Sequence, residues 1–168
     1  MSKNIYLIGF MGVGKSTIGK LLAEETKGQL MEMDETIEAE QNITINEIFA
    51  KYGETHFRNL ESELVERISK QEDTIVSCGG GAVLRPENVA NMKKSGSIVF
   101  LTATPETIYE RVRYSTNRPL LNGNMNVEYI AGLMEKRRAL YETAADVKIS
   151  TDGKDKWEIV GEILQNVN

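Results

Sequence analysis

The chain has 168 residues, of which 40% are hydrophobic and 27% charged, and its formal net charge is -5. These values are typical of one soluble globular domain, the acidic balance argues against a nucleic-acid partner, and no apolar run approaches the ~18 residues of a membrane span. The single Cys78 cannot form an internal disulfide, and the N-terminus lacks the pattern of a signal peptide. We therefore expect a cytoplasmic protein, with a monomer as the default state.

Apolar periodicity predicts strands and helices that alternate along the chain. In the first half, we expect strands at 5–8 and 29–33 and helices at 15–26, 34–41, 44–51 and 56–70. In the second half, we expect strands at 74–77, 97–101 and 147–150 and helices at 86–94, 105–113, 127–143 and 154–167. This order predicts one three-layer α/β/α domain over residues 1–168, with a central parallel sheet of about five strands.

Residues 9–17 read GFMGVGKST, directly after the first predicted strand. This stretch matches G-x-x-x-x-G-K-[ST], the phosphate-binding loop, whose glycines let backbone N–H groups converge on phosphate oxygens. Lys15 would reach the β- and γ-phosphates, and the Ser16 hydroxyl would ligate Mg²⁺. We therefore predict that ATP, with Mg²⁺, is bound by Gly12, Val13, Gly14, Lys15, Ser16 and Thr17.

Three features narrow the class of phosphate-loop protein. The chain has no Asn-Lys-x-Asp guanine reader, the strand at 74–77 ends in Ser77 where Mg²⁺-holding ATPases have Asp, and the chain is short for a motor ATPase. These features favour a kinase for a small acceptor. The acceptor remains open at this point, with gluconate or a nucleotide as alternatives, and so does a nucleotide-binding protein without turnover.

Candidate acceptor residues follow the predicted strands, where ligands bind in parallel sheets. Glu32 and Asp34 place two carboxylates at one strand end, suited to Mg²⁺ or an acceptor hydroxyl, although both could be solvated acids. Residues 79–81 are all glycine, which indicates either close approach to a ligand or a tight turn. The polar loop 114–126 is the candidate lid.

Three arginines also stand out, each of which could instead be an ordinary solvated or ion-paired side chain. Arg118 lies in the candidate lid, before Pro119, where it could fold over the phosphates. Arg58 and Arg137 lie on predicted helices.

Over residues 3–167 the chain resembles the shikimate kinase family. The resemblance is carried, in order, by residues 9–17, 33–38, 48–49, 53–54, 57–58, 61, 79–83, 118–121, 137 and 141. It implies ATP-dependent phosphorylation of the 3-hydroxyl of shikimate, giving 3-phosphoshikimate and ADP, in aromatic amino-acid biosynthesis. It also implies a P-loop NTPase fold like that of nucleoside monophosphate kinases, with a substrate-binding segment at 34–61 and a lid at 114–126.

The resemblance also implies roles for particular residues. Asp34 would hold the acceptor hydroxyl, and the catalytic cations would be Lys15 and Arg118. Shikimate would contact Asp34, Arg58, Gly79, Gly80, Gly81 and Arg137. The nucleotide would further contact Arg111 at adenine, Arg118, and the loop around Asp152.

The chain departs from this family at one position. The family usually shows Asp-x-Asp where this chain has Glu32-Met33-Asp34. Glu32 is one methylene longer, so its carboxylate would reach differently toward a Mg²⁺-bound water. Asp34 is retained, whereas the support of the metal by Glu32 is left open.

Overall fold

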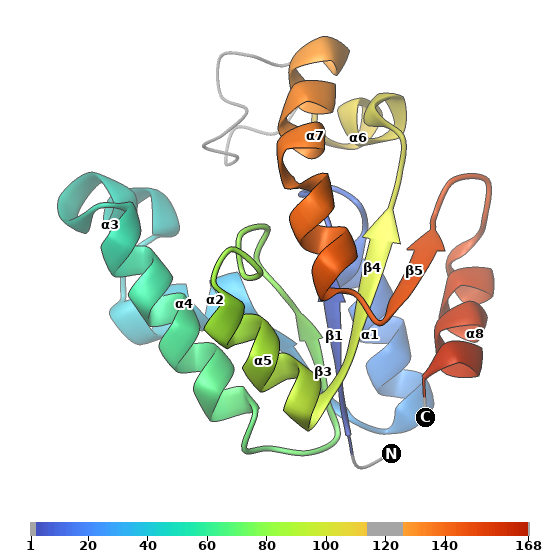
Figure 1. Ribbon diagram of the computed structural model, residues 1–168, viewed down its shortest axis with the longest axis horizontal. Coiled ribbons are helices and arrows are strands. Elements are labelled where there is room, and N and C mark those ends of the chain that lie inside the picture. The colour runs from blue at the N-terminus through green and yellow to red at the C-terminus, as the bar shows by residue number, and fades with distance from the viewer. Residues whose placement is uncertain (1–2, 114–125, 168) are drawn as a thin grey trace.

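The computed structural model describes residues 3–113 and 126–167, and in that part of the chain five strands form one parallel sheet (Figure 1). The strands are β1 (Asn4–Ile8), β2 (Gln29–Glu32), β3 (Thr74–Ser77), β4 (Gly96–Thr102) and β5 (Val147–Ser150). Their order is β2-β3-β1-β4-β5, which places β1 at the centre. The predicted parallel sheet of about five strands is confirmed.

Helices cover both faces of the sheet, which gives the predicted three layers. One face carries α1 (Lys15–Thr26) and α8 (Lys156–Asn166), and the other carries α4 (Glu54–Ile68) and α5 (Pro86–Ser95) (Figure 1). The remaining helices are α2 (Met33–Gln41), α3 (Ile45–Tyr52), α6 (Pro105–Val112) and α7 (Val127–Ala144). Among the described residues, no helix has both the length and the apolar character needed to cross a membrane.

The central strand explains why both faces are covered. Successive side chains of a strand point to opposite faces, and all five residues of β1 are buried. Leu7 belongs to the core beneath α1 and α8, whereas Tyr6 and Ile8 belong to the core beneath α4 and α5. The sheet therefore separates two apolar cores that share one strand.

Element ends differ slightly from the predicted ones, for local reasons. The strand predicted at 29–33 ends at Glu32, because Met33 is buried in the first turn of α2. The last helix begins at Lys156 and not at 154, because the Asp155 side chain accepts hydrogen bonds from the N–H groups of Trp157 and Glu158. Such a carboxylate cap marks the residue before the first helical turn.

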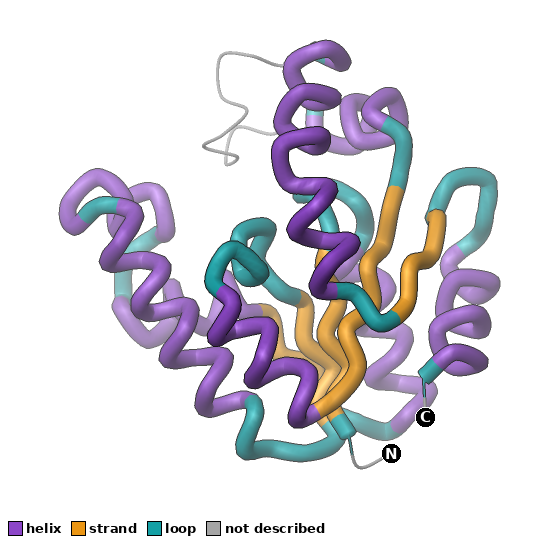
Figure 2. The backbone as a smooth tube through the Cα atoms, viewed as in Figure 1, coloured by secondary structure: helices purple, strands orange, loops and turns teal. Residues whose placement is uncertain are grey.

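The carboxyl ends of the strands gather at one edge of the sheet, where loops lead into the next helices (Figure 2). Residues 9–14 follow β1, α2 follows β2 directly, and the glycines at 79–81 follow β3. The parallel order thus brings the phosphate-binding loop, Asp34 and the triple glycine to the same edge.

Candidate active site

The phosphate-binding loop joins the buried strand β1 to the N-terminus of α1. Gly12 and Gly14 have φ angles of 83° and 108°, a region that side chains other than glycine rarely adopt. Gly14 is also the N-cap of α1, and because glycine has no side chain, no N-cap side chain occupies the first N–H groups of the helix. The first N–H groups of the helix and its positive end therefore face the cleft, which is the arrangement that binds phosphate.

Two cationic side chains contact this loop. The Lys15 ammonium donates to the carbonyl oxygens of Gly9 (2.6 Å) and Phe10 (3.2 Å). From α6, Arg111 Nη1 donates to the carbonyl oxygens of Val13 (2.8 Å) and Gly12 (3.2 Å). Positive charge from two elements thus lies beside the loop, where it favours an anion.

Ser16 and Glu32 form the candidate metal contact. The Ser16 hydroxyl donates to Glu32 Oε2 at 3.0 Å, so the longer side chain of Glu32 reaches the predicted Mg²⁺ ligand directly. Mg²⁺ prefers oxygen ligands and commonly takes one or two from the protein, with the rest from water and phosphate. This pair of oxygen donors beside the loop fits such an ion.

A cleft of about 1030 Å³ opens at this edge, at the upper end of the usual volume range of ligand sites. Its walls include the phosphate-binding loop, the start of α2, the start of α3 and the loop before α8. Among its lining residues are Gly12, Lys15, Ser16, Thr17, Glu32, Asp34, Asn46, Gly79, Gly80, Arg111, Thr151 and Lys154.

Asp34 lies against the first glycine of the triple-glycine turn. A Cβ atom added to Gly79 would be 2.8 Å from Asp34 Oδ1 and 3.1 Å from Glu61 Oε2. Glycine is required here because any side chain would displace one of these carboxylates. Asp34 comes from α2 and Glu61 from α4, so the turn joins two elements that sequence patterns treat separately.

An arginine side chain lies against each of the other two glycines. A Cβ on Gly80 would be 3.0 Å from Arg137 Nη1, and a Cβ on Gly81 would collide with the guanidinium of Arg58. The turn therefore brings Asp34, Arg58 and Arg137 together. The tight turn expected as one alternative is present, with the N–H groups of Ala82 and Leu84 bonded to the carbonyl oxygens of Gly79 and Gly81. Close approach of a ligand stays a prediction.

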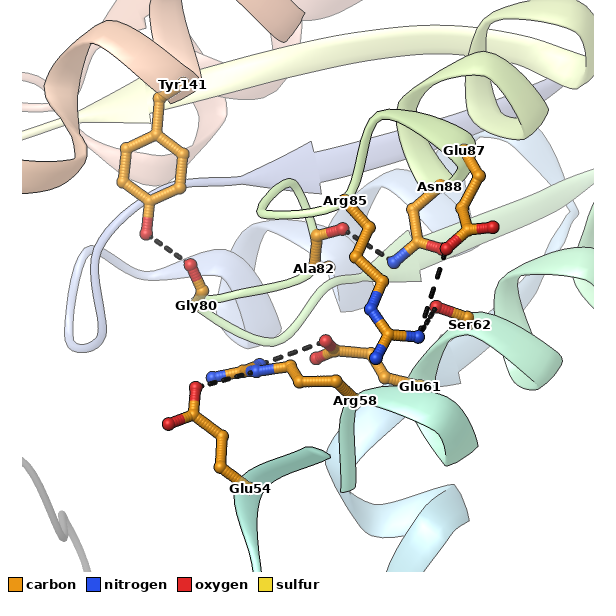
Figure 3. Close-up of polar contacts among 10 residues, drawn as sticks. All are labelled: Glu54, Arg58, Glu61, Ser62, Gly80, Ala82, Arg85, Glu87, Asn88 and Tyr141. Carbon is orange, nitrogen blue, oxygen red and sulfur yellow. Dashed lines mark hydrogen bonds and ion pairs between the residues drawn. The ribbon is translucent and has the colours of Figure 1, made fainter. Parts of the chain in front are cut away.

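Glu61, to which the sequence pattern assigned no role, holds Arg58 in this arrangement (Figure 3). Arg58 Nη1 donates to Glu61 Oε1 at 3.0 Å, and Glu61 is only 1% exposed. Burial raises the pKa of Glu61, while the Arg58 charge opposes that rise. The signal that could have found this pair is its spacing of three residues on one helix.

Of two further residues predicted to contact the nucleotide, Asp152 and Arg118, the structure describes only Asp152. The Asp152 carboxylate accepts hydrogen bonds from the Thr104 N–H (2.9 Å) and the Thr107 hydroxyl (2.8 Å), which brace the loop against α6. Its neighbours Thr151 and Lys154 line the cleft. Arg118, with most of the predicted lid, lies outside the described residues.

Comparisons with known proteins identify the family. The family profile described as shikimate kinase matches residues 11–168. A shikimate kinase of Persephonella marina is 43% identical over 165 residues, covering 98% of this chain and 99% of the relative.

Two solved structures agree with this match. The shikimate kinase of Acinetobacter baumannii in complex with shikimate has a TM-score of 0.91 at 32% identity, covering 97% of this chain and 91% of the other. The shikimate kinase of Aquifex aeolicus has a TM-score of 0.83 at 38% identity, covering 97% and 95%. Matches of this length, on a chain that joins a phosphate-binding loop to a carboxylate and two arginines, show that the chain belongs to the shikimate kinase family.

Proposed function

We propose that this chain transfers the γ-phosphoryl group of ATP to the 3-hydroxyl of shikimate, giving 3-phosphoshikimate and ADP in aromatic amino-acid biosynthesis. Membership of the shikimate kinase family supports this function. The observation that carries it is the convergence of Asp34, Arg58 and Arg137 on one glycine turn beside a phosphate-binding loop. A carboxylate and two guanidiniums match an acceptor that has hydroxyls and a carboxylate.

The donor half of the site is the phosphate-binding loop with its cations. Residues 12–17 hold the phosphates through backbone N–H groups and the helix N-terminus. Lys15 neutralises charge at the β,γ-bridge, and Arg111 lies toward the adenine. The loop around Asp152 borders the base, because Thr151 and Lys154 line the same cleft.

The acceptor half is the glycine turn with the side chains that rest on it. Arg58 and Arg137 bind the shikimate carboxylate, since a guanidinium fork matches a carboxylate bidentately. Residues 79–81 contribute their backbone to the shikimate site, and the space that side chains would fill there is taken by the carboxylates and guanidiniums that rest on the turn.

In the reaction, the 3-hydroxyl oxygen of shikimate attacks the γ-phosphorus. The bond from that phosphorus to the β,γ-bridging oxygen breaks, ADP leaves, and the hydroxyl proton passes to the Asp34 carboxylate. Charge on the migrating phosphoryl group is stabilised by Lys15 and Arg118. The role of Arg118 is a prediction from the sequence, because this residue lies outside the described part of the chain.

Ser16 and Glu32 would hold Mg²⁺ together with the phosphates of ATP. When bound, the ion neutralises phosphate charge and orients the β- and γ-groups. The hydrogen bond between Ser16 and Glu32 supports this assignment, because it places two oxygen atoms side by side at the cleft wall.

We further propose that residues 1–168 form one kinase domain, with a substrate-binding segment at 34–61 and a lid at 114–126. A monomer without nucleic-acid or membrane partners, working in the cytoplasm, remains the prediction from sequence.

A coupled assay of ADP release tests the function, with Mg²⁺-ATP as donor and shikimate, gluconate or a nucleoside monophosphate as acceptor. We expect turnover that depends on shikimate and exceeds that with the other acceptors. Absence of shikimate-dependent ADP release would overturn the proposal, and faster turnover of gluconate or a nucleotide would reassign the acceptor.

A further inference from the structure

The carbonyl oxygens of the triple-glycine turn are held in two different ways. The Gly79 oxygen accepts the N–H of Ala82, and the Gly81 oxygen accepts the N–H of Leu84, both at 3.1 Å. These are local bonds of the turn itself. The Gly80 oxygen is instead held from outside the turn, by the hydroxyl of Tyr141 at 2.6 Å (Figure 3).

Burial and ring packing fix the position of the Tyr141 side chain that donates this hydrogen bond. It lies on α7 and is only 2% exposed. Its ring packs against that of Phe100 on β4, with ring centroids 5.1 Å apart. Burial raises the pKa of Tyr141, and the adjacent Arg137 guanidinium only opposes part of that rise, so the hydroxyl remains a donor at neutral pH.

The same helix face also carries Arg137, one turn before Tyr141. Arg137 lies over Gly80, where an added Cβ would be 3.0 Å from its Nη1 atom. The hydrogen bond of Tyr141 thus locks α7 to the backbone on which Arg137 rests. If α7 moved relative to this turn, Arg137 would move with it.

We propose that Tyr141 is a positioning residue for the acceptor, which holds the Gly80–Gly81 peptide and thereby the relation of Arg137 to the turn. A trans peptide is planar, with its C=O and N–H on opposite sides, so fixing the Gly80 oxygen toward α7 turns the Gly81 N–H away from α7. Two flanking glycines would otherwise leave this peptide free to rotate. This inference rests on the proposed function, because the acceptor is taken to be shikimate.

Tyr141→Phe tests the proposal, because it removes the hydroxyl and keeps the ring that packs on Phe100. We expect the KM for shikimate to rise about three- to tenfold, as for loss of one buried hydrogen bond. The KM for ATP and kcat should change less than about twofold, since the phosphate-binding loop is untouched. Calorimetry without ATP should show the same loss of shikimate affinity.

Tyr6→Phe is the matched control. Tyr6 is fully buried in the same core, and its hydroxyl contacts the Ser95 hydroxyl at 2.7 Å, at the far end of α5 from the cleft. This variant loses the hydrogen bond to Ser95 and also the one that Asn4 Nδ2 donates at 3.2 Å, so it should lower Tm at least as much as Tyr141→Phe does. Only Tyr141→Phe should raise the KM for shikimate.

Three outcomes would overturn the proposal: unchanged amide hydrogen exchange, and two kinetic results. One is a shikimate KM in Tyr141→Phe within twofold of the parent, and the other is an equal rise in Tyr6→Phe, which would assign the effect to general core stability. A parent enzyme without shikimate turnover would refute the proposed function instead. Amide hydrogen exchange at residues 80–82 separates the two failures, because it needs no substrate: faster exchange in Tyr141→Phe supports the holding role, and unchanged exchange refutes it.

Discussion

At the scale of single residues, the Arg58 guanidinium is fixed by ion pairs within its own helix, without a bound acceptor. Its Nε donates to Glu54 at 3.3 Å and its Nη1 to Glu61 at 3.0 Å, and its side chain is 13% exposed. Two carboxylates on one helix therefore fix the guanidinium, which lowers the entropy lost when it binds a ligand. Removing Arg58 altogether would leave the buried Glu61 without its cation, which is strongly destabilising.

Arg58→Lys is therefore the informative substitution, since it keeps the charge and loses the planar fork. We expect the KM for shikimate to rise by roughly tenfold with little change in the KM for ATP, as expected for a charged hydrogen bond. Steady-state kinetics with each substrate varied measures this split. Arg138→Lys, at an exposed arginine that pairs with Glu135 on α7, is the control, and equal losses for both substrates would instead indicate a folding defect.

Asp34→Asn tests the proposal that Asp34 is the general base that takes the proton of the acceptor hydroxyl. The amide keeps the size of the side chain beside Gly79 but cannot take the hydroxyl proton. We expect kcat to fall about a hundredfold or more, the range for loss of a general base, with ATP affinity nearly unchanged. Single-turnover kinetics and nucleotide binding measure the two quantities, and an unchanged kcat would exclude the proposed role of Asp34.

At the scale of elements, α2, α3 and α4 are joined by polar contacts as well as by apolar packing. Glu38 Oε2 on α2 accepts the N–H of Ile45 at the start of α3, at 2.9 Å. Arg67 on α4 donates two hydrogen bonds of 2.7 Å to Glu40 on α2. These contacts tie the helix that bears Asp34 to the helix that bears Arg58.

The pair of Glu40 and Arg67 should make a small contribution to stability that depends on pH. Hydrogen bonding to Arg67 lowers the pKa of Glu40 below its ordinary value of 4.5. The carboxylate is therefore favoured in the folded chain, and its contribution is present above pH 4.5 and lost as the pH falls through the lowered pKa. Both side chains are substantially exposed, so solvent screening keeps the contribution near 0.5 kcal/mol.

Glu40→Gln should reduce the free energy of unfolding by about that 0.5 kcal/mol at pH 7 in low salt, and by less at pH 3 or high salt. Urea titrations at the two pH values measure the difference. Glu66→Gln is the control, because Glu66 pairs with Lys70 just past the end of the same helix and contacts no other helix through this pair. A loss that is equal at pH 7 and pH 3 would contradict the ionic origin.

At the scale of the whole molecule, the two cores lie on opposite faces of one sheet and share β1. Leu7 packs in one core and Tyr6 in the other, so neither core can form without the central strand. This arrangement supports the proposal that the chain folds as one domain.

Unfolding should therefore be a single cooperative transition. We expect the calorimetric enthalpy to equal the van't Hoff enthalpy, and ADP to raise Tm by binding only the folded state. Scanning calorimetry with and without ADP measures both. Two separate transitions, with ADP shifting only one, would show that the two cores fold independently.

Local patterns in the sequence determined the elements and the phosphate-binding loop. Strand and helix periods, together with glycines at positions that need positive φ, depend on neighbouring residues, so the sheet, the helices and the phosphate-binding loop were predictable from the residue order. The same local information singled out Asp34 and the arginines but left ordinary solvated or ion-paired roles open, and their proposed roles toward the acceptor came from the family resemblance. It placed element ends only to within a few residues, because caps and buried first turns such as Met33 depend on packing.

Only the tertiary structure decided which side chains meet. Gly80 and Tyr141 are 61 residues apart, and they touch because β4 lies beside β1 in the sheet order and α7 returns over β4. The burial of Glu61 and the contact of Ser16 with Glu32 likewise depend on how helices are set against the sheet. Such contacts are nonlocal, so no period or motif in the sequence encodes them directly.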